Sequence, residues 1–180
     1  MRIDLHQQLA AGVCEPFPMN SCVVIGGGIA GLSAAWALSR HCRVTLLEQN
    51  SRPGSESSGK SAAIFRCLDL SEGGAVLALR SGELLDELLG TRERWLKPTG
   101  LVYVAQHESS LRALAALGRK LSMPLRKLDH AELTSLVPSL EETQARHGLF
   151  SPTEGTLDVH EILGALERTA TQCGARIRQN

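Results

Sequence analysis

The pattern of apolar and polar positions that most clearly predicts secondary structure lies between residues 21 and 49. A short run of mainly β-branched apolar residues at 22–25 predicts a buried strand. A second apolar run at 44–47 predicts another strand, which ends at Glu48. Between the two runs, apolar residues recur at helical spacing: Leu32, Ala35, Trp36 and Leu38. The order of strand, helix and strand predicts a βαβ unit.

Downstream of this unit the pattern changes twice. Residues 49–63 are mostly small and polar, which predicts a loop. A helix is then expected within residues 64–94, with a broad apolar face that packs on a core. The face is formed by Val76, Leu77, Leu79, Leu84, Leu85, Leu88 and Leu89.

The last eighty or so residues predict shorter elements. Residues 101–105 form a strand pattern without a helix signature, and leucines at 111, 114, 117 and 121 mark an amphipathic helix. Residues 125–128 are extended. Asp129 and Glu132 have the spacing of a capping box that opens a helix to about residue 137. Residues 148–150 predict a strand.

The C-terminal residues predict one more helix and strand. Asp158 and Glu161 again have the spacing of an N-cap and an acid three residues later, ahead of a helix over 162–173. Gly174 fits the C′ position of that helix, and a strand begins at residue 175.

The turn between the first strand and the first helix carries the motif G-x-G-x-x-G. Gly26 allows a tight turn, Gly28 lets the backbone approach a pyrophosphate, and Gly31 lets helix and strand pack closely. The helix N-terminus presents N–H groups and a partial positive charge to phosphates, and Ile29 and Ala30 contribute backbone N–H groups there. The sequence therefore predicts a dinucleotide-binding turn.

Two further features extend this site. Glu48 closes the second strand about twenty residues on, where a carboxylate accepts hydrogen bonds from a ribose 2′-OH and disfavours a 2′-phosphate. Gln49 begins the small-residue loop, which leaves the carboxyl end of a parallel strand, the edge where open α/β sheets bind ligands. Arg52 in that loop is expected to pair with a phosphate or to cover the adenine.

Composition excludes several classes of function. The chain of 180 residues has 19 basic and 19 acidic residues and 3% aromatic residues, so neither a basic field nor stacking surfaces favour nucleic acid. No apolar run approaches the roughly twenty residues that span a bilayer. Five scattered cysteines show neither CxxC nor metal-ligand spacing, which favours reduced thiols, a cytoplasmic location and no metal site.

The segments GGGIAGLSAAWAL, VTLLEQ and RPGSESSGKSAAIFR together resemble the start of the FAD-dependent amine and amino-acid oxidoreductases. This is the D-amino-acid oxidase-like superfamily, which includes glycine oxidase, sarcosine oxidase and D-amino-acid dehydrogenases. The later segments TGLVYVA, LVPSL and EGTLDVHEILGAL are similar to that family too, so the resemblance runs from about residue 21 to the last residue.

The resemblance implies a fold of class α/β: a Rossmann-like FAD-binding βαβ unit with the start of an interleaved antiparallel α+β substrate domain. Residues 1–20 are an extension, 21–97 and 158–180 belong to the FAD-binding domain, and 98–157 belong to the substrate domain. In the family roughly as much sequence again follows, so the chain is expected to be a truncated portion of a flavoenzyme.

The resemblance also implies the chemistry. FAD is expected to be held without a covalent bond, because Ser57 and Ser58 stand where some relatives attach it through a His. The expected reaction is hydride transfer from an amino acid or amine to the flavin, with oxygen or a respiratory carrier as electron acceptor. Arg66 is a candidate ligand of the substrate carboxylate. The expected cofactor-binding residues are Gly26, Gly28, Ile29, Ala30, Gly31, Glu48, Gln49, Arg52, Ser58, Gly59, Ser61 and Ala62.

Two other hypotheses stay open at this point. The first fifty residues would equally serve a NAD-binding dehydrogenase domain, although the small-residue loop and the antiparallel segment after it count against that. A non-catalytic remnant that binds nucleotide weakly or not at all is the other. No general base is identifiable, because no Ser/His/Asp set or His/Cys cluster has catalytic spacing.

Overall fold

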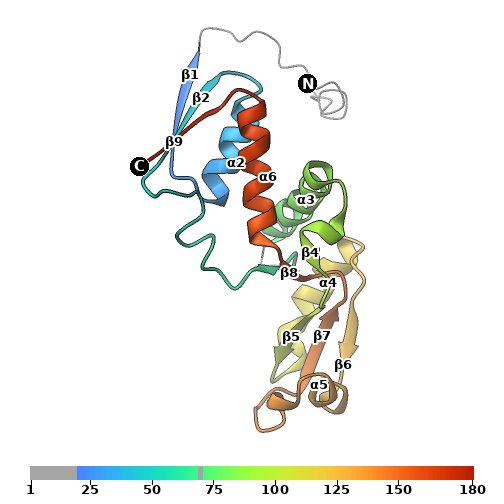
Figure 1. The fold of residues 1–180 in the computed structure, drawn as a ribbon. Coiled ribbons are helices and arrows are strands. Elements are labelled where there is room, and N and C mark those ends of the chain that lie inside the picture. The colour runs from blue at the N-terminus through green and yellow to red at the C-terminus, as the bar shows by residue number, and fades with distance from the viewer. Residues whose placement is uncertain (1–19, 69–70) are drawn as a thin grey trace. The chain divides into compact units, whose positions relative to one another are not determined.

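A computed structural model describes residues 20–68 and 71–180 of the chain, which form two compact units (Figure 1). The described part of the first unit comprises residues 20–61 and Val159–Asn180, and the second unit is Ala62–Asp158. The chain passes from the first unit to the second after Ser61 and returns after Asp158, whereas the sequence analysis placed functional boundaries at residues 97–98 and 157–158. The functional boundaries remain predictions, and of the predicted extension at residues 1–20, residues 1–19 lie outside the described residues.

The first unit is built on a parallel sheet in the order β1-β2-β9. The strands are β1 (Ser21–Ile25), β2 (Arg43–Glu48) and β9 (Arg176–Gln179). Two helices, α2 (Ile29–Leu38) and α6 (Val159–Gln172), lie side by side against it (Figure 1). The predicted βαβ unit is therefore present, and β9 joins it from the far end of the chain as a third parallel strand.

Among the residues that the structure describes, the two faces of this sheet differ in burial. Leu46 is buried, and α2 contributes Leu32, Ala35 and Trp36 to the same core. On the opposite face, the side chains of Val23 and Ile25 are 61% and 85% exposed. A parallel sheet is normally covered on both faces, whereas among the described residues Val23 and Ile25 leave an apolar surface on this one.

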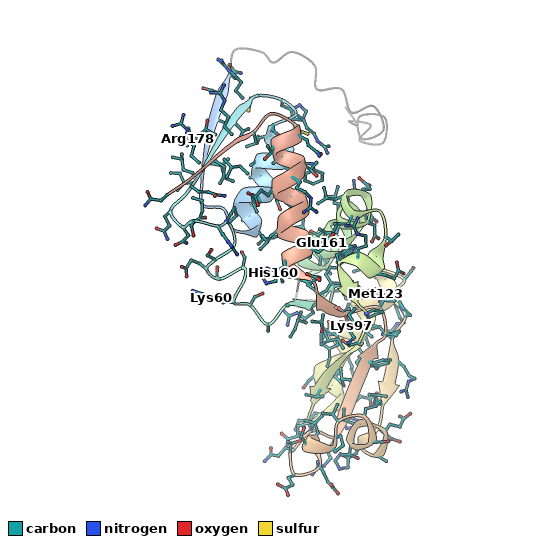
Figure 2. All side chains as sticks on the ribbon, viewed as in Figure 1. Lys60, Lys97, Met123, His160, Glu161 and Arg178 are labelled. Atoms are coloured by element: carbon teal, nitrogen blue, oxygen red, sulfur yellow. The ribbon has the colours of Figure 1, made fainter. Side chains whose placement is uncertain are left out.

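The connection after β2 is long and irregular. It runs from Gln49 to Ala63 without a helix or strand. Lys60, labelled in Figure 2, pairs with Glu56 across one turn at 2.8 Å. Both side chains are largely exposed, so this pair adds little to stability.

The second unit contains two antiparallel sheets, of which the smaller has the order β3-β8-β4. Its strands are β3 (Ile64–Phe65), β8 (Gly155–Leu157) and β4 (Leu96–Lys97), the last after a 3₁₀ turn, η1 (Arg92–Arg94). Trp95 is fully buried and packs edge-on against Phe65, with ring centroids 5.2 Å apart.

The predicted apolar face of helix α3 (Glu72–Leu89) was wrong. Its buried positions are Ala75, Gly82 and Leu89, whereas Leu77 is 69% exposed. The predicted positions do not share one face, because Leu77 and its neighbour two residues on lie about 200° apart around a helix. Gly82 faces Phe65 and Trp95 instead, where a larger side chain would crowd the ring of Phe65.

The larger sheet has the order β5-β7-β6 and a layer on each face. Its strands are β5 (Leu101–Ala105), β7 (His147–Ser151) and β6 (Arg126–Leu128). The 3₁₀ turn η2 (Glu108–Leu111) and helix α4 (Arg112–Lys120) form a core with Leu149, as the leucine spacing predicted. Helix α5 (His130–Leu136) and η3 (Pro138–Leu140) form a second core around Leu133.

Two local predictions about helix ends are confirmed. Asp129 accepts from the Glu132 N–H at 2.9 Å and the Glu132 carboxylate accepts from the Asp129 N–H, which completes the capping box of α5. Gly174 follows α6 with a φ of +90°, the left-handed conformation of a C′ glycine. No helix in the described part of the chain combines the length and apolar character needed to cross a bilayer.

Candidate cofactor site

The glycine turn after β1 brings strand and helix into close contact. Gly26 has a φ of +97° and donates its N–H to the Leu47 carbonyl at 2.8 Å, which fixes the turn to β2. At Gly31 a Cβ atom would overlap the Gly26 carbonyl oxygen, so the first turn of α2 packs directly on the strand end. This geometry is the one for which the motif selects glycine.

Helix α2 begins directly after this turn. Gly28 is its N-cap, with extended backbone and no side-chain cap, and the first turn carries no acidic residue. The positive end of the helix dipole is therefore not offset by a carboxylate from its own helix. Such an end attracts phosphate groups.

Glu48 ties the end of β2 to the glycine turn. Its Oε2 accepts from the Gly27 N–H at 2.6 Å and its Oε1 accepts from the Asn50 N–H at 2.8 Å. These backbone hydrogen bonds, that of Asn50 first, lower the pKa of Glu48 below its ordinary value. An ionised carboxylate is thus fixed beside the turn, and its remaining lone pairs suit ribose hydroxyl groups.

The loop after β2 returns to the same helix end. The Ser58 hydroxyl accepts from the Ile29 N–H at 3.0 Å, and the Gly54 N–H donates to the Gly27 carbonyl at 2.9 Å. The Gly59 N–H donates to the Gly54 carbonyl at 2.9 Å and the Ser61 hydroxyl to the Ser58 carbonyl at 3.1 Å. The loop is thereby ordered against the N-terminus of α2.

These features surround one cavity of about 360 Å³. Its size lies in the range of small-molecule and cofactor sites. The residues that line it are Ile25, Gly26, Gly27, Gly28, Leu47, Glu48, Gln49, Gly54, Ser55, Glu56, Ser57 and Ser58.

Five of the predicted cofactor residues line this cavity: Gly26, Gly28, Glu48, Gln49 and Ser58. Four others do not line the cavity but contact residues around it. Ile29 donates to Ser58, Gly31 packs on Gly26, and Gly59 and Ser61 form hydrogen bonds within the loop. Ala30 and Arg52 are not among the lining residues, and Ala62 and Arg66 belong to the second unit. The assignment of all these residues to cofactor or substrate binding remains a prediction.

Sequence reasoning missed two kinds of lining residue. Ile25 and Leu47 are apolar strand ends, which read as core positions, although Ile25 is 85% exposed. Gly54 was treated only as a loop residue, yet a Cβ there would overlap the Leu163 side chain of α6. Its signal in the sequence is the Pro53-Gly54 pair, which is typical of a turn.

Comparison with known families decides the classification. The family model DAO, described as FAD dependent oxidoreductase, matches residues 21–180. The chain belongs to this family of FAD-dependent oxidoreductases. The match covers both units of the structure, and it confirms the resemblance that the glycine motif, the loop and the later segments indicated.

Individual relatives agree with this classification. Mitochondrial sarcosine dehydrogenase of Mus musculus is 26% identical over 178 residues, covering 94% of this chain and 19% of its own length. Among solved structures, L-proline dehydrogenase from P. horikoshii aligns with a TM-score of 0.74 and 25% identity. Glycine oxidase from Geobacillus kaustophilus aligns with a TM-score of 0.66 and 25% identity.

These alignments cover most of this chain but a much smaller share of each relative. The alignments cover 92% and 87% of this chain but 45% of each of the two solved chains. The chain therefore spans a fifth or less of the curated relative and under half of the solved relatives.

Proposed function

We propose that the chain holds FAD without a covalent bond in the cavity at the N-terminus of α2, as part of a flavoenzyme that oxidises the C–N bond of an amino acid or amine. The observation that carries this proposal is the convergence of three features on one cavity. These are the glycine turn, the ionised Glu48 and the loop that Ser58 anchors to Ile29.

Each group has a defined task in this proposal. The open end of α2 attracts the pyrophosphate, Glu48 accepts from ribose hydroxyl groups, and the loop shields the phosphates from water. Residues 49–63 contain no histidine, which supports non-covalent attachment in this loop. The family match favours FAD over the NAD-binding alternative.

The substrate class follows from the relatives rather than from the cavity. Their names point to sarcosine, L-proline and glycine, which are all small amino acids. Bound flavin supplies the centre that accepts the hydride, and the protein positions the substrate. We assign Arg66 to the substrate carboxylate. Oxygen or a respiratory carrier takes the electrons, and the location is cytoplasmic.

The test is an anaerobic reduction experiment on the flavin-loaded chain. Purified protein is equilibrated with FAD, freed from unbound dye and mixed with sarcosine, L-proline or glycine in turn. Bleaching of the long-wavelength flavin band by at least one of them supports the proposed reaction. Retained flavin that none of the three bleaches points to a binding remnant, and retention of NAD in place of FAD contradicts the cofactor assignment.

A further inference from the structure

A buried carboxylate lies at the junction of the two sheets in the second unit. Glu154 immediately precedes β8 and has no exposed surface. Its own carbonyl accepts from the Gly100 N–H at 3.0 Å, which fixes its backbone beside the start of β5. A carboxylate without solvent contact needs several hydrogen-bond donors to offset its desolvation.

The donors come from two segments distant in sequence. Glu154 Oε1 accepts from the Cys67 N–H, from the Leu68 N–H at 3.2 Å, and from the Tyr103 hydroxyl at 2.9 Å. Burial, and then the charge of Glu154, raise the pKa of the Cys67 thiol to about 11 and that of Tyr103 well above its usual range. Cys67 and Tyr103 are therefore both neutral near neutral pH.

The segment that Glu154 holds begins one residue after Arg66. Cys67 and Leu68 follow β3, which itself follows the cofactor loop along the chain. Arg66 is close enough for its charge to oppose the rise in the pKa of Tyr103. The Glu154 side chain thus fixes the two peptide N–H groups that follow Arg66 in the chain.

Stability alone gives a weak reason for this arrangement. Replacing a buried charge and its partners by well-packed apolar residues is often neutral or stabilising. A carboxylate, by contrast, accepts two N–H groups and a hydroxyl in one fixed geometry, which a packed methyl group does not. Such an arrangement is expected where the orientation of the backbone at residues 67–68 matters for function.

We propose that Glu154 is a positioning residue for the substrate-carboxylate ligand: by holding the Cys67 and Leu68 amides it sets the direction of Arg66. This inference rests on the proposed function, in which Arg66 binds the carboxylate of an amino acid. Glu154 itself touches neither substrate nor flavin in this account.

A double-mutant cycle tests the inference. The flavin-loaded wild type, Arg66→Gln, Glu154→Gln and the double variant are mixed anaerobically with sarcosine over a range of concentrations. The concentration for half-maximal bleaching rate is expected to rise on the order of tenfold in each single variant. The double variant should match Arg66→Gln alone, because the second change acts through the first.

Two controls separate positioning from general damage. Glu142→Gln removes the same charge from an exposed position of the second unit and should leave sarcosine binding unchanged. Tyr103 is the one tyrosine in the sequence, so tyrosinate absorbance reports directly on this cluster. In Glu154→Gln the phenol should ionise at lower pH than in the wild type, whereas flavin retention should stay the same.

Each outcome is decisive. Additive effects in the double variant, or a Glu154→Gln variant with wild-type sarcosine dependence, overturn the inference and leave the proposed function standing. If Glu154→Gln fails to fold, Tyr103→Phe removes one donor and keeps the carboxylate, and it should then weaken sarcosine binding without loss of flavin. Where L-proline or glycine but not sarcosine bleaches the wild-type flavin, that amino acid replaces sarcosine in the cycle. Retained flavin that none of the three bleaches in the wild type overturns the inference together with the proposed reaction, and failure of the wild type to retain flavin also overturns the cofactor assignment.

Discussion

At the scale of single residues, Glu48 has a structural task, and we propose that it also has a binding task. Its two oxygens accept from Gly27 and Asn50, and the same carboxylate lines the candidate cofactor cavity. The motif and the strand pattern predicted its position, because both depend on nearby sequence. Its hydrogen bond to Gly27 joins residues 21 positions apart and follows from the parallel pairing of β1 and β2.

Glu48 should make the stability of the first unit depend on pH. Its pKa in the folded chain lies below the ordinary value of 4.5, because backbone N–H groups stabilise the ionised form. Its contribution is then complete above that value and is lost as the pH falls through the lower pKa of the folded state. Thermal unfolding of wild type and Glu48→Gln should therefore differ at neutral pH and converge in acid. A constant difference at all pH values would contradict this.

Gly31 should tolerate no side chain. In Gly31→Ala the new methyl group overlaps the Gly26 carbonyl, so α2 must move away from β1 at a cost of at least about 2 kcal/mol. Gly73→Ala in α3 is the matched control, because nothing lies within 4 Å of its Cβ position. The control should be neutral or stabilising by up to about 1 kcal/mol. Denaturant unfolding followed by far-ultraviolet circular dichroism measures both changes, and a neutral Gly31→Ala would refute the first.

Elements differ in how far the sequence predicts them. The strands β1 and β2 and helix α2 were predicted because local apolar spacing decides them. The buried face of α3 was not, since its apolar residues surround the helix and the face that packs depends on side chains outside it, such as Phe65 and Trp95 against Gly82. The hydrogen bonds of Glu154 could not be predicted either, because the donor at Cys67 lies 87 residues away along the chain.

The capping box of α5 gives a test at this scale. Asp129→Ala removes the acceptor for the Glu132 N–H and should lower the stability of the second unit by about 1 kcal/mol. Asp129→Asn keeps a side-chain oxygen and should cost less than half of that. Trp95 lies in the second unit, so its fluorescence in a Trp36→Phe background follows this transition. Equal losses in the two variants would count against the cap.

At the scale of the whole molecule, the chain combines a first unit with a Rossmann-like parallel sheet and a second unit with antiparallel sheets. The family resemblance predicted both, and the parallel return of β9 beside β2 agrees with it. The bare face with Val23 and Ile25, and the way the loop closes on α2, did not follow from the sequence. Exposure depends on which segments reach a surface, and the Ser58–Ile29 bond joins residues 29 positions apart.

The central claim is that the cavity at the N-terminus of α2 holds FAD. The most direct measurement is the absorbance spectrum of the purified chain after incubation with FAD and removal of free dye, for wild type, Glu48→Ala and the exposed control Glu142→Ala. The account predicts a retained, structured flavin band for wild type and control, and a strongly reduced band for Glu48→Ala. A folded wild-type chain that retains no flavin, or a Glu48→Ala chain that retains as much as the wild type, would contradict it.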